Sequence, residues 1–249
     1  MSLQELQSHV VYRSLSDLRI KLFADGANLE HMMNLAARPY IKGFTTNPTL
    51  MRKAGITDYQ GFACRVLEHI TERPVSFEVF SDEFDEMERQ ARIIAAWGSN
   101  VYVKIPVTNT RRESSVPLIR KLVGDGLKLN ITALMTLEQV QTVAQALLPD
   151  VPSIVSVFAG RIADSGRDPV PMMRAALEKL SALPLAELLW ASPREVLNAI
   201  QADQIGCHII TVTADVLEKL SLIGKDLDEF SLDTVKMFHS DAQAANYQV

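Results

Sequence analysis

The sequence predicts a single-domain α/β protein, a (β/α)8 barrel of the TIM type, and three observations support this. Short β-rich segments alternate with longer segments of helical period, as expected when parallel strands are linked by crossover helices. Eight strand segments can be counted. The chain has 249 residues, and one such barrel typically needs about 250.

Each strand candidate is a short run rich in branched and aromatic side chains. In chain order the candidates are Ile20–Ala24, Ile41–Thr45, Val75–Phe80, Val101–Pro106, Leu127–Thr132, Ile154–Phe158, Glu187–Ala191 and His208–Val212. Eight strands, each followed by a crossover, are enough to close the barrel.

The segments between the strands carry apolar residues at spacings of three and four, which predicts amphipathic helices. The clearest are Asp58–Thr71, Asp82–Trp97, Leu137–Leu148, Pro169–Leu180, Pro193–Asp203 and Asp215–Leu222. Asp82, Ser192 and Thr213 occupy positions typical of N-caps. The glycines expected to end helices in a left-handed conformation are Gly98, Gly124, Gly206 and Gly224.

The barrel is expected over about residues 19–224 of a single domain that spans 1–249. A C-terminal helical extension follows, over about 225–249, and a leading segment, roughly Gln4–Leu18, precedes the first strand. These two extra helical segments could cap the barrel or contact a neighbouring subunit of a homo-oligomer.

Composition argues against several classes of protein. The chain is 47% hydrophobic and 22% charged, as in ordinary globular enzymes, and its net charge is −5 with basic residues scattered among acids. Nucleic acid is therefore not expected as a partner. No apolar run is long enough for a membrane helix, and the first ten residues contain no apolar signal region. We expect a cytoplasmic protein with no membrane contact.

Neither a metal nor another cofactor is expected. The five histidines, His9, His31, His69, His208 and His239, do not cluster at strand ends or show ligand spacing. No glycine-rich nucleotide loop follows the first strand.

Polar residues gather at the carboxyl ends of the strands, where barrels of this kind hold their active sites. They are Asp25, Thr45, Thr46, Asn47, Glu78, Lys104, Asn130, Thr132, Ser156, Arg161, Ser192, Arg194, Thr211 and Thr213.

Lys104 indicates the chemistry most directly, because it is a single ammonium in the buried strand run Tyr102–Val107. Removal from water disfavours the charged form, and a neutral amine can attack a carbonyl to form an imine. Alone, Lys104 would more simply lie at the strand end and extend into water. Its polar neighbours favour catalysis.

Two carboxylates accompany this lysine. Asp25 could be only an N-cap or turn residue before Asn28, but a carboxylate that faces this lysine could also take a hydroxyl proton from a substrate and return it. Glu78 shares a strand face with Ser76, so its side chain is expected to point inward. Beside Thr132 it could orient the water that adds to and leaves a carbinolamine.

Three residues that could bind an anion follow the sixth and seventh strands: Arg161, Ser192 and Arg194. Barrels of this kind commonly bind phosphate at the ends of their last strands. An arginine fork and a hydroxyl suit that anion. Taken alone, Arg194 would be a surface ion pair, whereas two arginines converging on one corner predict an anion site.

These motifs resemble those of the transaldolases over about Lys21 to Leu222. The resemblance rests on Asp25–Gly26–Ala27–Asn28, Gly43–Phe44–Thr45–Thr46–Asn47–Pro48–Thr49–Leu50, Lys104–Ile105–Pro106, Asn130–Ile131–Thr132, Ser156–Val157–Phe158–Ala159–Gly160–Arg161–Ile162 and Ala191–Ser192–Pro193–Arg194.

The resemblance implies a Schiff-base transaldolase, in which Lys104 attacks a ketose phosphate and Asp25 takes the C4 hydroxyl proton as the C3–C4 bond breaks. Glu78 and Thr132 would hold the catalytic water. Substrate-binding roles are implied for Asn47, Thr45, Asn130 and Ser156 toward the three-carbon fragment, and for Arg161, Ser192 and Arg194 toward phosphate. The chain departs from the family pattern in the loop from Val107 to Ser114, and separately at Pro193. The identity of the donor and acceptor sugars is therefore left open.

Two alternatives remain. One is a simple aldolase related to fructose-6-phosphate aldolase, which releases free dihydroxyacetone; that branch typically has Gln where this chain has Glu78. The other is a non-catalytic barrel that binds sugar phosphates. The presence of Lys104, Asp25, Glu78 and Thr132 together argues against it.

Overall fold

The computed structural model describes residues 12–246, and these separate into two compact units. The larger unit is Arg19–Glu218 and contains every strand of the described residues. The second unit contains residues 12–18 and 219–246. The expectation of one domain over the whole chain stays a prediction.

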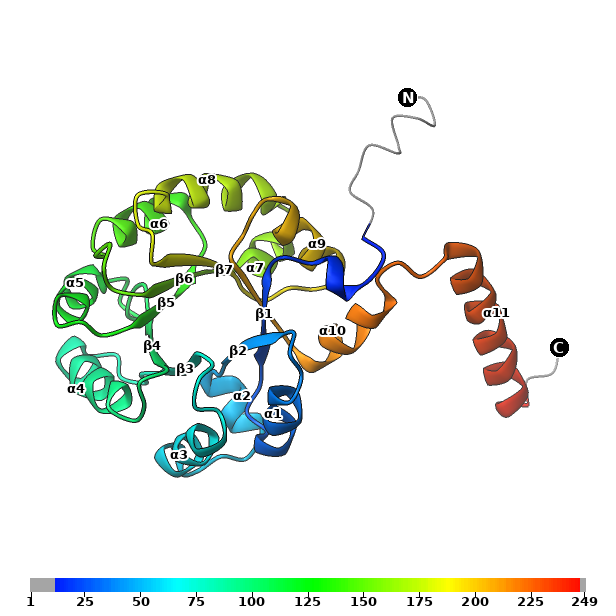
Figure 1. Cartoon of the computed structure of the whole chain (residues 1–249), viewed down its shortest axis with the longest axis horizontal. Coiled ribbons are helices and arrows are strands. Elements are labelled where there is room, and N and C mark those ends of the chain that lie inside the picture. The colour runs from blue at the N-terminus through cyan, green and yellow to red at the C-terminus, as the bar shows by residue number, and fades with distance from the viewer. Residues whose placement is uncertain (1–11, 247–249) are drawn as a thin grey trace. The chain divides into compact units, whose positions relative to one another are not determined.

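The larger unit is a closed barrel of eight parallel strands in sequence order, with β8 pairing back onto β1. Helices surround the ring of strands (Figure 1). The predicted (β/α)8 fold is therefore confirmed. The strands are β1 (Lys21–Asp25), β2 (Ile41–Thr45), β3 (Val75–Glu78), β4 (Val101–Pro106), β5 (Leu129–Leu134), β6 (Ser153–Val157), β7 (Ala186–Trp190) and β8 (Ile209–Val212).

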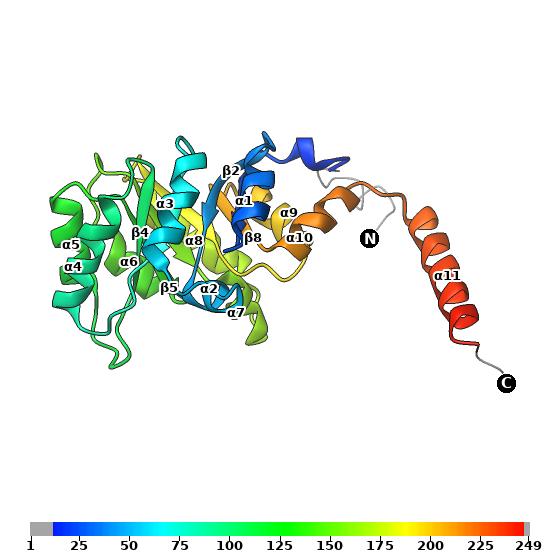
Figure 2. The ribbon, with the colours of Figure 1, turned by 90° about the horizontal axis from the view of Figure 1, so that it is seen from below.

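The crossover helices each bury one apolar face against the strands. They are α1 (Leu29–Ala36), α3 (Tyr59–His69), α4 (Phe84–Ala95), α5 (Val116–Gly124), α6 (Leu137–Ala144), α8 (Val170–Leu180), α9 (Leu197–Gln204) and α10 (Ala214–Lys219). Two additional short helices, α2 (Pro48–Lys53) and α7 (Ala159–Asp164), directly follow β2 and β6. Both lie at the lower end of the barrel in Figure 2, the end at which the strands finish.

Side chains fill the interior of the barrel. Phe23, Ile154, Leu189 and Ile209 come from four different strands and form one buried cluster. Gly43 makes room for it, because a Cβ at that position would lie 2.5 Å from the Phe23 ring. The barrel is thus a packed core, and chemistry is possible only at its mouth.

Helix starts follow local chemistry in some places and tertiary contacts in others. Asn28, Asn47, Asp58 and Thr136 cap α1, α2, α3 and α6 through their side-chain oxygens. Thr213 directly precedes α10. These caps are short-range features that the residue types favour.

Two predicted caps are wrong. The residue before α4 is Glu83, and Asp82 instead accepts hydrogen bonds from the backbone and hydroxyl of Thr110. Ser192 has φ +57° and is followed by an irregular segment, so α9 begins only at Leu197.

The expected left-handed glycines are correct in two of four cases. Gly206 and Gly224 have positive φ, while Gly98 and Gly124 do not, and Gly126 takes that role after α5. Gly124 is itself the last helical residue.

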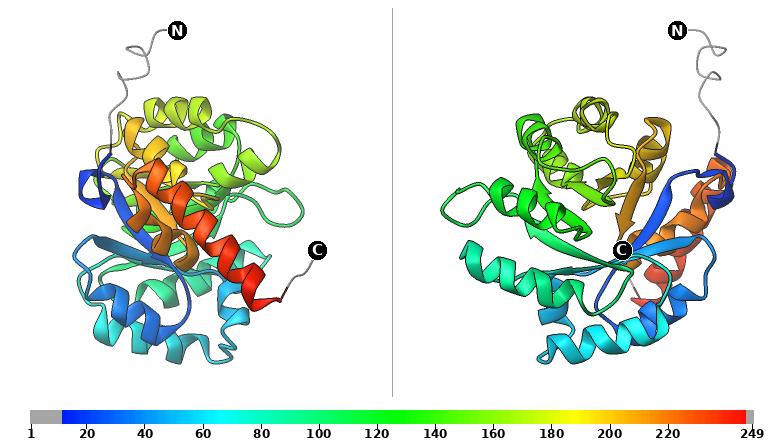
Figure 3. Two further views of the ribbon diagram at one scale, coloured as in Figure 1. Left: turned by 90° about the vertical axis from the view of Figure 1, so that its right-hand side faces the viewer. Right: turned by 60° about the vertical axis from the view of Figure 1, so that its left-hand side comes forward.

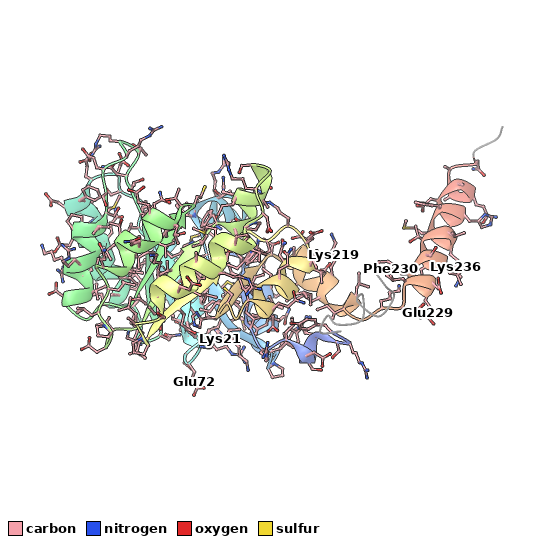
Figure 4. The ribbon with its side chains drawn as sticks, turned by 90° about the horizontal axis from the view of Figure 1, so that it is seen from above. Lys21, Glu72, Lys219, Glu229, Phe230 and Lys236 are labelled. Atoms are coloured by element: carbon pink, nitrogen blue, oxygen red, sulfur yellow. The ribbon has the colours of Figure 1, made fainter. Side chains whose placement is uncertain are left out.

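The second unit contains two 3-10 turns, η2 (Leu15–Asp17) and η3 (Leu220–Leu222), and the helix α11 (Leu227–Ala244). Gly224 is required there, because a Cβ would lie 2.1 Å from the carbonyl oxygen of Arg13. Figure 4 labels three side chains of α11, Glu229, Phe230 and Lys236. The amine of Lys225 lies over the face of the Phe230 ring, 4.4 Å from the ring centroid. Most of the predicted leading segment lies outside the described residues.

Among residues 12–246 there is no helix with both the length and the apolar character that crossing a membrane requires.

Candidate active site

A cavity of about 400 Å3 opens at the carboxyl ends of the strands. The structure brings ten of the eleven predicted site residues to its wall and leaves Arg194 outside it. The ten are Asp25, Thr45, Asn47, Glu78, Lys104, Asn130, Thr132, Ser156, Arg161 and Ser192.

Lys104 is the amine that lines this cavity. It is 7% exposed and sits in β4 directly opposite Glu78 of β3 and Asn130 of β5. Its amine donates to the carbonyl oxygen of Thr46 at 2.8 Å and lies 3.2 Å from Glu78 Oε2. The cation is thus withdrawn from water and held by one carboxylate and one carbonyl.

Asp25 is the last residue of β1, the strand that lies across the barrel from β5. The Thr45 hydroxyl donates to Asp25 Oδ1 at 2.8 Å, and it lies 2.5 Å from the Thr211 hydroxyl. Burial raises the pKa of the Asp25 carboxyl above 3.8, although Lys104 and the Thr45 bond act to lower it. A raised pKa makes the carboxylate a better proton acceptor, which suits a group that takes and returns a hydroxyl proton.

Thr132 completes the polar group around the amine on the β5 side. Its hydroxyl is buried and has no hydrogen-bond partner among the described residues. The backbone turns sharply just after it, because Ala133 has φ +64° and the β5–β6 register shifts between Ile131 and Leu134. Such strain in a residue other than glycine costs about 1–3 kcal/mol and is typical of functional sites.

A buried chain of polar side chains crosses the floor of the cavity. Ser156 donates to Asn130 Oδ1 at 2.6 Å, and Asn130 donates to the Ser76 hydroxyl at 3.0 Å. These bonds fix the orientation of the Asn130 amide beside Lys104.

Asn47 lines the cavity and also stabilises the start of a helix. Its side chain accepts from the backbone N–H of Leu50 and so caps α2. The cap fixes the segment from Asn47 to Leu50, all of which lines the cavity.

The arginines of the predicted anion site differ in placement. Arg161 lines the cavity together with Ser192. Arg194 is 46% exposed in its side chain and pairs with Asp164, to which both its Nε and an Nη donate. In this structure one arginine, not two, faces the cavity, and Arg194 forms the surface ion pair that its sequence position also allowed.

Close packing around Gly160 fixes this corner. The N–H of Gly160 donates to Ala191 at 3.3 Å, and a Cβ at Gly160 would lie 1.6 Å from the carbonyl oxygen of Ser192. Only glycine therefore lets α7 approach the left-handed turn at Ser192.

The segment between β4 and α5 projects from the barrel as a loop (Figure 3). An antiparallel bridge joins Thr108 and Ser114 across it. Arg111 pairs with Glu83 at 2.8 Å and Asp82 at 3.2 Å, which ties the loop to the start of α4. This is the segment whose sequence departs from the transaldolase pattern.

Sequence reasoning did not assign a role to several residues of the wall. Thr211 carries a hydroxyl at the end of its strand. Its contact with Thr45 could be predicted only from the pairing of β8 with β1, which closes the barrel. Phe158 and Ala133 also line the cavity. An aromatic residue and a small one at strand ends carry no chemical signal by themselves.

Within residues 12–246 no three histidine, cysteine or acidic side chains lie close enough together to hold a metal ion.

A family model described as "Transaldolase/Fructose-6-phosphate aldolase" matches residues 22–249 of the chain. That match covers every strand of the barrel except the first residue of β1, and every residue of the cavity wall.

Individual relatives have names consistent with this model. A "Probable transaldolase" of Dehalococcoides mccartyi is 33% identical over 202 residues, which are 81% of this chain and 90% of the relative. A "Probable transaldolase 2" of Listeria monocytogenes is 31% identical over 218 residues, 86% of this chain and 95% of the relative. A "Probable transaldolase" of Methanococcus maripaludis is 32% identical over 202 residues, 81% of this chain and 89% of the relative.

Proposed function

We propose that this chain, which belongs to the transaldolase/fructose-6-phosphate aldolase family, is a transaldolase. It would transfer a dihydroxyacetone unit from a ketose phosphate to an aldose phosphate through a Schiff base on Lys104. The observation that carries the proposal is the buried amine 3.2 Å from Glu78 in a cavity that Asp25 also lines.

The first step is condensation. With its extra proton passed to Glu78, the Lys104 amine attacks the C2 ketone of the donor to give a carbinolamine. Loss of water then forms the imine. Glu78, 3.2 Å from the amine, would donate a proton to the leaving water and take one back on hydrolysis. The Thr132 hydroxyl, which has no partner among the described residues, would hold that water.

The second step is cleavage. The Asp25 carboxylate removes the proton from the C4 hydroxyl, the C3–C4 bond breaks, and its electrons pass into the protonated imine. An aldose phosphate leaves, and the three-carbon unit stays on Lys104 as an enamine. A second aldose phosphate is then attacked by this enamine, and Asp25 returns its proton to the new hydroxyl.

Binding roles follow from placement around the amine. Asn130 and Ser156 form the hydrogen-bonded floor, and Asn47 lies across from them on the wall, so these three would hold the hydroxyls of the three-carbon unit. Thr45 holds Asp25 in place. Arg161 and Ser192 would bind phosphate, and Arg194 would join them only after leaving Asp164.

Glu78 favours transfer over simple aldol cleavage, since the aldolase branch typically carries Gln there. Free dihydroxyacetone would still be the product if the enamine met water before an acceptor. A barrel that binds sugar phosphates without chemistry is the third possibility, and it would leave Lys104 unmodified.

All three candidate functions imply a role in carbohydrate metabolism. By default we place the enzyme in the pentose phosphate pathway, with fructose 6-phosphate or sedoheptulose 7-phosphate as donor. A cytoplasmic location and a homo-oligomeric state are part of the same proposal.

The test is a panel of ketose phosphate donors and aldehyde acceptors, with Lys104→Met as control. Acceptor-dependent formation of a new ketose phosphate supports transfer. Release of free dihydroxyacetone at the same rate with and without acceptor would establish the aldolase instead, and turnover by Lys104→Met would refute the Schiff base.

A further inference from the structure

Glu78 lies where the pairing between β2 and β3 has stopped. The last backbone bond between these strands runs from the Thr46 N–H to the Ser76 carbonyl at 3.2 Å. After Thr46 the chain turns into the Asn47 cap and Pro48, the first residue of α2. The backbone N–H and C=O of Glu78 on that side therefore have no strand to bond with.

One hydroxyl takes the place of the missing strand. The Tyr59 oxygen accepts from the Glu78 N–H at 2.8 Å and donates to the Glu78 carbonyl at 3.0 Å. A phenol has one proton and two lone pairs, so it can form both bonds at once. Burial raises the pKa of Tyr59 above 10, which keeps the donating proton in place at working pH.

The position of Tyr59 is itself fixed. It is the first residue of α3, and Asp58 caps that helix by accepting from the Gly61 N–H at 2.8 Å. Its ring packs edge-on against the rings of Phe80 and Trp97, with distances between ring centroids of 4.5 Å and 5.5 Å. A helix cap and an aromatic cluster thus hold the hydroxyl against the strand end.

We infer that Tyr59 is a positioning residue: its hydroxyl fixes the backbone of Glu78 and, through it, the carboxylate that faces the Lys104 amine. The inference rests on the proposed function of Glu78 and Lys104. Because β4 holds only the other edge of β3, by the bond from Val79 to the Lys104 carbonyl at 3.2 Å, loss of the hydroxyl frees one edge of the strand end.

The variant Tyr59→Phe keeps the ring and removes both bonds. A displacement of a catalytic group by about 1 Å can cost up to about 100-fold in rate, so we expect kcat to fall by about 10-fold to 100-fold with KM for the donor within about twofold. Tyr40→Phe is the matched control, since the Tyr40 hydroxyl accepts from Arg38 at the other end of β2. It should leave kcat unchanged.

A double-mutant cycle separates positioning from a general loss of packing. If Tyr59 acts through the Glu78 carboxylate, Tyr59→Phe has less than about a twofold effect on kcat in a Glu78→Ala background. An equal loss in both backgrounds would overturn the inference.

The unmodified protein supplies a second measurement that does not depend on a variant folding. Hydrogen exchange should find the Glu78 amide protected, and exchange as fast as in an exposed loop would overturn the inference. Borohydride trapping of a ketose phosphate on the wild-type enzyme distinguishes the two levels of failure. Trapping by wild type with an unchanged kcat in Tyr59→Phe refutes Tyr59 alone, whereas no trapping by wild type refutes the Schiff base and with it this role.

Discussion

Lys104 and Glu78 are direct neighbours across the β3–β4 ladder, and their charged groups meet at 3.2 Å. In a parallel barrel, residues in register on adjacent strands point to the same side. The ladder itself therefore places an acid beside the amine, without any flexible loop between them.

The pH dependence of turnover should report the Asp25 carboxyl. The Thr45 hydroxyl bond stabilises the ionised form of Asp25 and lowers its pKa. Thr45→Val removes that bond, so the pKa rises further and the acid limb of the pH–rate profile moves to higher pH. Rates of the wild type and the variant from pH 4 to 8 give the measurement.

Thr142→Val is the control for this shift, because the Thr142 hydroxyl donates to a backbone carbonyl on the surface of α6. Its acid limb should coincide with that of the wild type. A limb that stays in place, or moves to lower pH, in Thr45→Val would contradict the role of Asp25 as the proton shuttle.

Asp164 should compete with substrate phosphate for Arg194. Asp164→Asn weakens an exposed ion pair of the kind worth about 0–1 kcal/mol, so KM for a phosphorylated donor should fall by up to about fivefold. KM for the corresponding unphosphorylated sugar should not change. Asp168→Asn, in the loop that follows α7, is the control. A higher KM for the phosphorylated donor in Asp164→Asn would assign Asp164 a supporting role instead.

Gly160→Ala should destabilise the protein by about 1–3 kcal/mol, the usual effect of forcing an extra methyl group into a packed site. The new Cβ would meet the Ser192 carbonyl oxygen. Gly124→Ala is a matched control in which the Cβ meets nothing within 4 Å, and it should be neutral or stabilising by up to about 1 kcal/mol. Urea unfolding measures both, and equal stability of the two variants would refute this packing.

The two thiols should differ in reactivity. Burial raises the pKa of Cys207 to about 12, and its thiol donates to the backbone carbonyl of Leu188 at 3.4 Å, whereas Cys64 is exposed. A thiol reagent at pH 8 should therefore label one cysteine per native chain and two per unfolded chain. In the native Cys64→Ser variant, the reagent should label no cysteine. Fast native labelling of Cys207 would show that the β7–β8 side of the barrel opens.

The sequence predicted the strands well because branched residues and turn signals are local. Every strand was located within two residues at each end. The largest differences come from tertiary structure: β3 stops at Glu78 rather than Phe80, where its neighbour β2 has already turned away. Similarly β5 runs on to Leu134 through the bulge at Ala133.

The candidate site was predictable to the extent that strand-end position determines it. Polar residues at the ends of parallel strands converge in a barrel, so ten of eleven predicted residues line one cavity. Arg194 lies outside and pairs with Asp164 of α7, a partner 30 residues earlier in the chain. Tyr59 was not predicted for the same reason, since its role depends on where β2 ends relative to β3.

The most direct test of the account is reduction of the enzyme with borohydride in the presence of fructose 6-phosphate, followed by mass spectrometry of its peptides. We predict a three-carbon or six-carbon adduct on Lys104, absent in Lys104→Met and unaffected by Lys128→Met, which changes a surface lysine. An adduct on another lysine, or a turning-over enzyme that gives no adduct, would contradict it.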